Sequence, residues 1–229
     1  MTLLALDSAT TGCSVCVWRG GDILAHDMRE MARGQAEVLL PMTAQALIEA
    51  DVAPEDIDAV AVTRGPGAFT GLRIALSAAR AFALARAIPC IGVTTLEAVA
   101  RAVPDAERDE RVILAAVESK RDDIYAQLFS PAGDELSEPL AADGAALAGL
   151  FSWNERVLIV GDAAGRARDM LIEHAIAADL SAARPLPDPA VVAAIAAERF
   201  RPGDLSAPEP LYLRPPDATL PKAEGRRRP

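Results

Sequence analysis

The residues best suited to chemistry in this chain lie in one glycine-rich run, Gly65-Pro66-Gly67-Ala68-Phe69-Thr70-Gly71-Leu72-Arg73. The run follows a strand-like stretch, 57–63, and opens a helical stretch, 72–87. We expect Gly67 to take a positive φ and Thr70 to cap the first free amides of the helix. Free amides at a helix N-terminus bind anions that can reach them. The run therefore predicts a phosphate or carboxylate cradle, a rigid contact surface for a partner, or a connector that binds nothing.

Two common nucleotide-binding signatures are absent from this run. In a Rossmann fingerprint the third glycine would stand at Thr70, but the glycine comes one residue later, at Gly71. A P-loop needs a Gly-Lys-Ser/Thr sequence, which does not follow. The run is therefore assigned to neither class.

Asp7 is the strongest acidic candidate, because it ends the first strand-like run just before a Ser/Thr/Gly turn. With Thr10 it would form a vestigial nucleotide and Mg²⁺ site, since carboxylates hold hydrated magnesium. Alternatively, it caps the amides of the turn. The two histidines, His26 and His174, are far apart, and no Gly-x-Ser-x-Gly elbow is present. We therefore expect no catalytic residue and no metal site.

Composition limits the classes of function. The chain has 229 residues, a net charge of −10 and 51% hydrophobic residues, which suits one large or two small domains with a real core. The negative field disfavours direct binding to nucleic acid or an anionic membrane. Three cysteines exclude a complete disulfide framework, and Cys13 and Cys16 would face opposite sides of a strand. We see no signal peptide or membrane span, and expect a cytoplasmic protein.

The order of elements predicts an α/β fold of two related subdomains, each of βββαβα type. The first, 1–103, combines strands 2–7, 13–18, 22–28, 57–63 and 90–93 with helices 37–50, 72–87 and 95–101. A charged linker, 104–111, follows. The second, 112–200, combines strands 112–118, 123–129, 134–138 and 156–160 with helices near 143–150, 162–174 and 189–200. A Pro-rich tail with a basic end occupies 201–229.

Two helices of the first subdomain are candidates for a partner interface. Helix 37–50 is apolar around most of its circumference, and such a helix must be buried on nearly all sides. Either a partner or the core of a larger fold would cover it. Helix 72–87 carries a polar face that would meet an acidic partner, a ligand anion or solvent. The predicted contact residues are Leu39, Met42, Leu47, Arg73, Ser77 and Arg80.

Several segments, in order along most of the chain, together resemble the bacterial TsaB family. The most specific is Gly65-Pro66-Gly67-Ala68-Phe69-Thr70-Gly71-Leu72-Arg73-Ile74. The others are Leu4-Ala5-Leu6-Asp7-Ser8-Ala9-Thr10, Glu37-Val38-Leu39-Leu40-Pro41-Met42, Val93-Thr94-Thr95-Leu96-Glu97-Ala98, Arg121-Asp122-Asp123-Ile124-Tyr125 and Pro210-Leu211-Tyr212-Leu213-Arg214.

The resemblance implies the actin/Hsp70/sugar-kinase (ribonuclease H-like) fold and a role in making threonylcarbamoyladenosine in tRNA, next to the anticodon. It implies a non-catalytic subunit that dimerises, through its first two helices, with the catalytic paralogue TsaD, joined by the ATPase TsaE. The paralogue's H-x-x-x-H metal motif is replaced here by Gly34-Gln35-Ala36-Glu37-Val38. ATP or ADP and Mg²⁺ would act only in the complex, which would also supply the contact with tRNA. Whether the chain alone forms a homodimer stays open.

Two other functions compete with the scaffold hypothesis. An active phosphotransferase or ATPase of the same fold would need a working site from Asp7, Thr10 and the glycine-rich run. A metallopeptidase would need a metal pair or a nucleophile motif, and the sequence offers neither.

Overall fold

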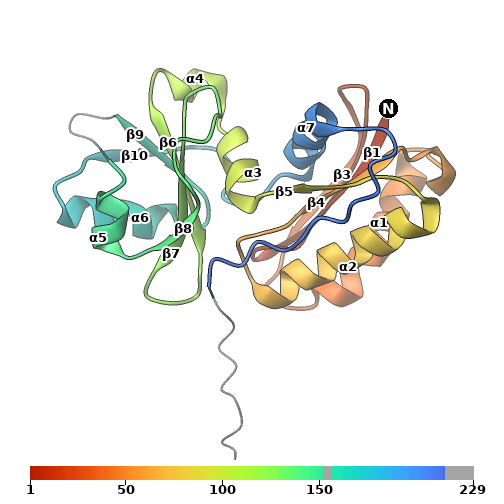
Figure 1. Ribbon diagram of the computed structural model, residues 1–229, viewed down its shortest axis with the longest axis horizontal. Coiled ribbons are helices and arrows are strands. Elements are labelled where there is room, and N and C mark those ends of the chain that lie inside the picture. Colours follow the sequence, from red (N-terminus) through yellow and green to blue (C-terminus); the bar gives the residue numbers. More distant parts are fainter. Residues whose placement is uncertain (152–155, 215–229) are drawn as a thin grey trace, which may run out of the picture.

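The computed structural model describes residues 1–151 and 156–214, and this part of the chain forms two α/β subdomains side by side (Figure 1). Each subdomain contains one five-stranded sheet with helices on both faces. The two sheets have the strand orders β3-β2-β1-β4-β5 and β10-β9-β6-β7-β8. In both, an antiparallel meander continues into parallel strands, so the second half repeats the first in topology.

The first sheet is built from β1 (Thr2–Asp7), β2 (Gly12–Arg19), β3 (Asp22–Glu30), β4 (Ala59–Thr63) and β5 (Cys90–Val93). β1 pairs antiparallel with β2 and parallel with β4, and every residue of β1 and β4 is buried. A strand buried on both faces reads as a continuous apolar run, as these two do. Cys13 and Cys16 are free and face opposite cores of this sheet, as predicted.

Helices cover both faces of the first sheet. α1 (Gln35–Glu49) and α2 (Phe69–Arg86) pack on one face, with a short 3-10 turn, η1 (Pro54–Asp56), between α1 and β4. The opposite face is covered by α7 (Pro189–Arg199), whose N-cap Asp188 accepts a hydrogen bond from the Ala190 amide. The chain therefore returns to its first sheet after completing the second.

The second sheet is built from β6 (Val112–Glu118), β7 (Ile124–Phe129), β8 (Leu140–Ala142), β9 (Val157–Val160) and β10 (Ala178–Leu180). One face packs against α5 (Gly144–Ala148) and α6 (Ala164–Glu173). The other packs against α3 (Thr95–Arg101), which precedes this subdomain in sequence. α3 and α7 thus lie between the two sheets, joined by the Glu97–Arg199 and Arg101–Glu198 ion pairs, with N–O distances of 2.5 and 2.6 Å.

The subdomain boundaries differ from the predicted ones at these two helices. The prediction placed 95–101 in the first subdomain and 189–200 in the second, but each helix packs on the opposite sheet. Sequence order assigns a helix to the strands nearest in the chain. Here the deciding factor is an uncovered apolar sheet face, which each helix fills from the other subdomain.

Three further elements differ from the sequence prediction. The expected strand 134–138 is a turn with a single bridge, and the third strand of the meander lies later, at β8. The edge strand β10 was not predicted, because it is short and half exposed. A short helix, α4 (Asp105–Arg108), lies inside the expected linker.

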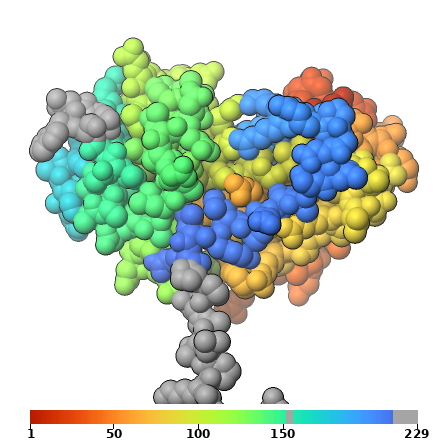
Figure 2. Space-filling model, viewed as in Figure 1, coloured from red at the N-terminus to blue at the C-terminus, as the bar shows by residue number. Residues whose placement is uncertain are grey.

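The described part of the C-terminal tail, 201–214, contains no helix or strand. Its last residues run from the first subdomain across to the second and cover part of the boundary between them (Figures 1 and 2). The basic end of the tail, 226–228, lies outside the described residues.

Neighbouring leucines of α1 test the placement of the first core. Leu39 is 1% exposed and Leu40 is 62% exposed. Leu39→Ala should lower the free energy of unfolding by about 2–5 kcal/mol, because it leaves a cavity. Leu40→Ala, the matched control, should change it by less than about 0.5 kcal/mol. Urea denaturation followed by circular dichroism measures both, and equal losses would contradict the assigned helix orientation.

Candidate functional site

The glycine-rich run packs directly on the loop between β1 and β2. A Cβ atom on Gly67 would lie 2.1 Å from the Ala9 carbonyl oxygen, and one on Gly71 would lie 2.0 Å from that of Ser8. The Ala68 amide donates to the Ala9 carbonyl at 2.7 Å, and the Ser8 hydroxyl donates to the Gly71 carbonyl at 2.7 Å. Two backbones approach this closely only where side chains are absent.

Two details of the predicted turn need correction. The positive φ belongs to Gly65, at 104°, and not to Gly67. Position 67 requires glycine because a Cβ atom there would collide with the Ala9 carbonyl oxygen. Thr70 does not cap the helix: α2 begins at Phe69, and its N-cap, Ala68, makes no side-chain cap. The sequence identified the segment correctly as a strand-to-helix turn but misassigned the roles of these residues.

Asp7 is buried at the end of β1, beside this turn. Its Oδ1 accepts hydrogen bonds from the Thr63 hydroxyl at 2.5 Å and from the Ala9 amide at 3.0 Å. The second bond is the turn cap considered as the alternative role. Burial raises the pKa of Asp7 to about 6, and the nearby Asp162 carboxylate adds to the increase. The Thr63 and Ala9 hydrogen bonds oppose this shift.

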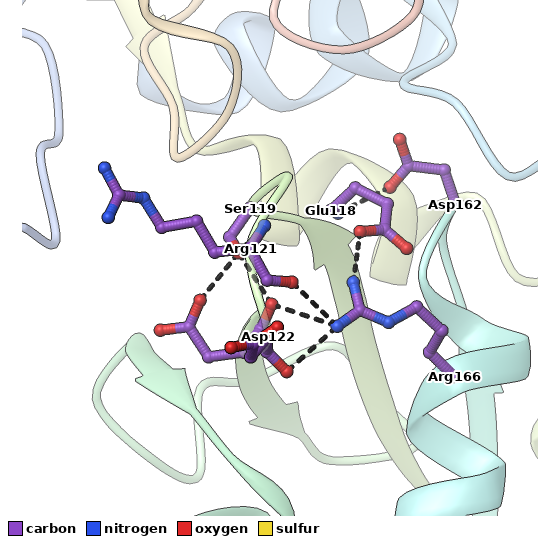
Figure 3. A network of polar contacts seen from close by, with 7 residues as sticks. Glu118, Ser119, Arg121, Asp122, Asp162 and Arg166 are labelled. Carbon is purple, nitrogen blue, oxygen red and sulfur yellow. Dashed lines mark hydrogen bonds and ion pairs between the residues drawn. The ribbon is translucent and has the colours of Figure 1, made fainter.

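Sequence reasoning missed the carboxylates that the second subdomain brings to this region. Asp162 follows β9 and accepts a hydrogen bond from the Glu118 amide at 2.9 Å, and burial raises its pKa. Glu118, at the end of β6, is paired with Arg166 of α6 at 2.5 Å (Figure 3). These residues are distant from Asp7 in sequence. The one sequence signal of their proximity is the repeated order of elements, which makes the ends of β1 and β6 equivalent positions in the two sheets.

A pocket of about 990 Å³ lies between the subdomains at this point. The first subdomain contributes Thr10, residues 32–37 and the turn with the start of α2; the second contributes 118–121 and Tyr125; the tail contributes 211–214. Thr10 is buried, and its hydroxyl has no hydrogen-bond partner among the described residues. Thr10 and the predicted turn residues other than Gly65 are therefore brought together at one cavity, whereas Asp7 does not line it.

A second, apolar groove of about 790 Å³ runs between α1 and α2. Its lining includes Leu40, Ile74, Ala78, Ala81 and Phe82. Leu40 is 62% exposed, and Ile48, two turns further along α1, is 73% exposed. An apolar surface of this kind marks a site of protein contact.

The predicted contact residues of α1 are corrected by this geometry. Leu39, Met42 and Leu47 have exposed fractions of 1%, 2% and 7%, because they face the sheet and fill the first core. The sequence predicted that α1 is apolar around most of its circumference but not which side faces the sheet. The exposed apolar side carries Leu40 and Ile48 instead.

The C-terminal tail of the chain contacts part of the polar face of α2. Arg80 donates to the carbonyl oxygen of Pro208 in the tail, so it is not a free contact for a partner. Arg73 lies over the ring of Phe69, 3.8 Å from its centroid, and its Nε donates to the Tyr212 hydroxyl at 3.2 Å. Ser77 is exposed on the helix surface, and its contact with a partner stays a prediction.

Within residues 1–151 and 156–214, no group of three or more His, Cys, Asp or Glu side chains is placed to hold a metal ion. In the same part of the chain, no helix combines the length and apolarity needed to cross a membrane. The absence of a catalytic metal stays a prediction.

The paired sheets of matching topology, the helices α3 and α7 that cross between them, and the pocket between the subdomains define an α/β protein of two related subdomains. The family model described as TsaD, tRNA N6-adenosine threonylcarbamoyltransferase, matches residues 29–186, which is more than half of the chain. The chain therefore belongs to the TsaD family, and proteins named TsaB are among its relatives.

Individual relatives agree with this assignment. The protein of Escherichia coli K12 named tRNA threonylcarbamoyladenosine biosynthesis protein TsaB is 38% identical over 125 residues, covering 55% of this chain and 53% of its own length. An uncharacterized protein of Mycobacterium leprae is 32% identical over 94% of this chain and 55% of its own length. The chain spans about half the length of the curated relatives it matches.

A solved structure matches nearly the whole chain. The Pseudomonas aeruginosa protein described as uncharacterized, with similarity to the peptidase YeaZ, superposes with a TM-score of 0.78 at 28% identity. The superposition covers 93% of this chain and 99% of the other. Both subdomains therefore share the fold of this relative, although the sequence match to the Escherichia coli protein covers only 55% of the chain.

The raised pKa of Asp7 predicts how stability depends on pH. The folded-state pKa, about 6, exceeds the ordinary value of 3.8, so the folded state is stabilised as pH falls through 6. Relative to Asp7→Asn, the wild type should gain roughly 2–2.5 kcal/mol between about pH 7.5 and pH 4. Urea unfolding across this range measures the gain, with exposed Asp56→Asn as control. If the difference in free energy of unfolding between the wild type and Asp7→Asn did not change with pH, the assigned burial of the Asp7 carboxyl would be contradicted.

The close backbone approach predicts a second outcome. Gly71→Ala should lower the free energy of unfolding by about 1–3 kcal/mol or more, because its Cβ would collide with the Ser8 carbonyl. Gly165→Ala, also at the start of a helix, has open space and should be neutral or stabilising by up to about 1 kcal/mol. Thermal unfolding compares the two, and similar effects would contradict the packing of the turn.

Proposed function

We propose that this chain is the non-catalytic scaffold subunit of a complex that makes threonylcarbamoyladenosine in tRNA, next to the anticodon. In this role it binds a TsaD-type catalytic subunit, and a TsaE-type ATPase joins the pair in the cytoplasm. The names of the TsaB relatives and the match to the TsaD family model support the pathway. The chain alone catalyses no reaction in this proposal.

The observation that carries the scaffold role is the apolar surface of α1 and α2. The groove between these helices, flanked by exposed Leu40, leaves apolar side chains in water in the isolated chain. A helical partner surface laid along the groove would bury them and continue the helical layer that already covers the first sheet. A paralogous subunit of the same fold would offer an equivalent pair of helices, and a second copy of this chain is the alternative occupant.

The electrostatics favour a supporting role over direct grip on RNA. The chain carries a net charge of −10, which repels a polyanion unless basic residues are concentrated against it. Contact with tRNA would then come through the complex. ATP or ADP and Mg²⁺ would also act at the level of the complex.

One observation supports the competing nucleotide-binding enzyme. Thr10 lines the pocket between the subdomains, and its buried hydroxyl has no hydrogen-bond partner in the part of the chain that the structure describes, so it is available to a ligand there; Asp7 lies buried behind the pocket lining. Tight binding of Mg-ATP by the isolated chain, lost in Asp7→Asn, would favour that function. Calorimetric titration of the isolated chain separates the two proposals.

Substitutions on the exposed side of α1 test the docking surface. Leu40→Asp and Ile48→Asp should leave the chain folded, since both side chains are exposed, and should weaken binding of a TsaD-type subunit at least about tenfold each. Ile172→Asp on α6 is the matched control, because it places the same charge on an exposed apolar position of the other subdomain. Isothermal titration calorimetry measures the affinities.

Circular dichroism checks that each variant is folded before the titration. Wild-type affinity in both α1 variants would contradict the proposed docking surface. Sedimentation measures whether the wild type associates with itself. If the α1 variants lose that self-association but bind the TsaD-type subunit with wild-type affinity, the surface belongs to a homodimer instead.

A further inference from the structure

Three segments that are distant in sequence meet at the end of the described tail: the turn 65–73, the β6–β7 loop 119–123, and residues 208–214. We propose that residues 208–214, called the strap below, latch the second subdomain to the first and thereby set the width of the pocket between them. The latch is the Arg214–Asp123 ion pair. This proposal does not depend on which partner the chain binds.

The strap is anchored firmly on the first subdomain. The Leu211 amide donates to the Arg64 carbonyl at 2.7 Å, and Arg80 donates to the Pro208 carbonyl. Two glycines make room for it: a Cβ on Gly65 would lie 2.9 Å from the Leu211 carbonyl oxygen, and one on Gly92 would lie 2.6 Å from the Pro208 Cβ. The backbone of the strap is therefore fitted to the carboxyl ends of β4 and β5.

An aromatic contact fixes the next residues of the strap. The Tyr212 ring lies 5.5 Å from the Phe69 ring, centroid to centroid, and its hydroxyl accepts a hydrogen bond from Arg73. Phe69, Arg73 and Tyr212 all line the pocket between the subdomains. The strap is thus part of the pocket wall up to the point where it crosses to the second subdomain.

The acceptor of the latch is held rigidly on the second subdomain. The Ser119 hydroxyl lies 2.6 Å from Asp123 Oδ1, and Arg166 of α6 donates to the carbonyl oxygens of Arg121 and Asp122 at 2.9 Å (Figure 3). Arg166 also pairs with Glu118, so one side chain ties the whole loop to α6. Asp123 is mostly buried, which makes its pair with Arg214 less screened than a surface pair.

The latch and the crossed helices join the subdomains at separate places. α3 and α7 connect the sheets through their packing and two ion pairs, whereas the strap connects them at the β6–β7 loop (Figures 1 and 2). Subdomains joined at one place rotate about it, and a second connection across the gap restrains that rotation. Breaking the latch should therefore release motion at the pocket without unfolding either core.

Double electron–electron resonance tests the latch directly in the full chain. Nitroxide labels on Ala85→Cys of α2 and Glu173→Cys of α6, both exposed, report the distance between subdomains. The native thiols do not compete, because burial raises the pKa of Cys13, Cys16 and Cys90 to about 11, 12 and 11. Arg214→Ala should roughly double the width of the distance distribution or shift it to longer values.

Control variants separate a latch from a general loss of structure. Arg214→Lys keeps the charge and should keep the narrow distribution, and Arg29→Ala breaks an ion pair inside β3 and should change nothing. Tyr212→Ala, which loosens the strap upstream of the latch, should broaden the distribution as Arg214→Ala does. Wild-type distributions in both Arg214→Ala and Tyr212→Ala would overturn the proposal.

Discussion

The close contact between the turn 65–71 and the β1–β2 loop is the constraint on which the rest of the first subdomain depends. Gly67 and Gly71 let two backbones meet at the carbonyls of Ala9 and Ser8, where any side chain would collide. This contact fixes where α2 begins relative to β1. It thereby determines the groove between α1 and α2 and one wall of the pocket between the subdomains. The same glycine-rich segment therefore shapes both the groove and the pocket.

The pocket and the groove both follow from the way helices cover the faces of the two sheets. Each sheet needs both faces covered, and α3 and α7 cover the inner faces by crossing between subdomains. α1 and α2 cover an outer face but carry apolar side chains on their own outer side as well. A protein that folded only for itself would have polar residues there. The apolar outer side is the physical argument for a subunit that works in a complex.

The sequence predicted the strand and helix order well, because buried strands and long apolar helices have strong periodic signals. α3 was placed at its observed residues, and the glycine-rich run was recognised as the key turn. What failed required three-dimensional information. Leu39 and Leu40 are equally apolar, and only the packing decides which one faces the sheet. Asp162 and the strap come to the region of Asp7 and the pocket from distant parts of the chain, so no local sequence pattern predicts that they lie there.

An omission assay shows whether synthesis of the modified nucleoside requires this chain. Threonylcarbamoyl-adenylate, unmodified tRNA, a TsaD-type subunit, a TsaE-type ATPase and ATP are combined with and without this chain, and the modified nucleoside is quantified by mass spectrometry. The scaffold account predicts product only when this chain and the TsaD-type subunit are both present, and none with this chain in place of that subunit. Equal product without the chain would contradict it.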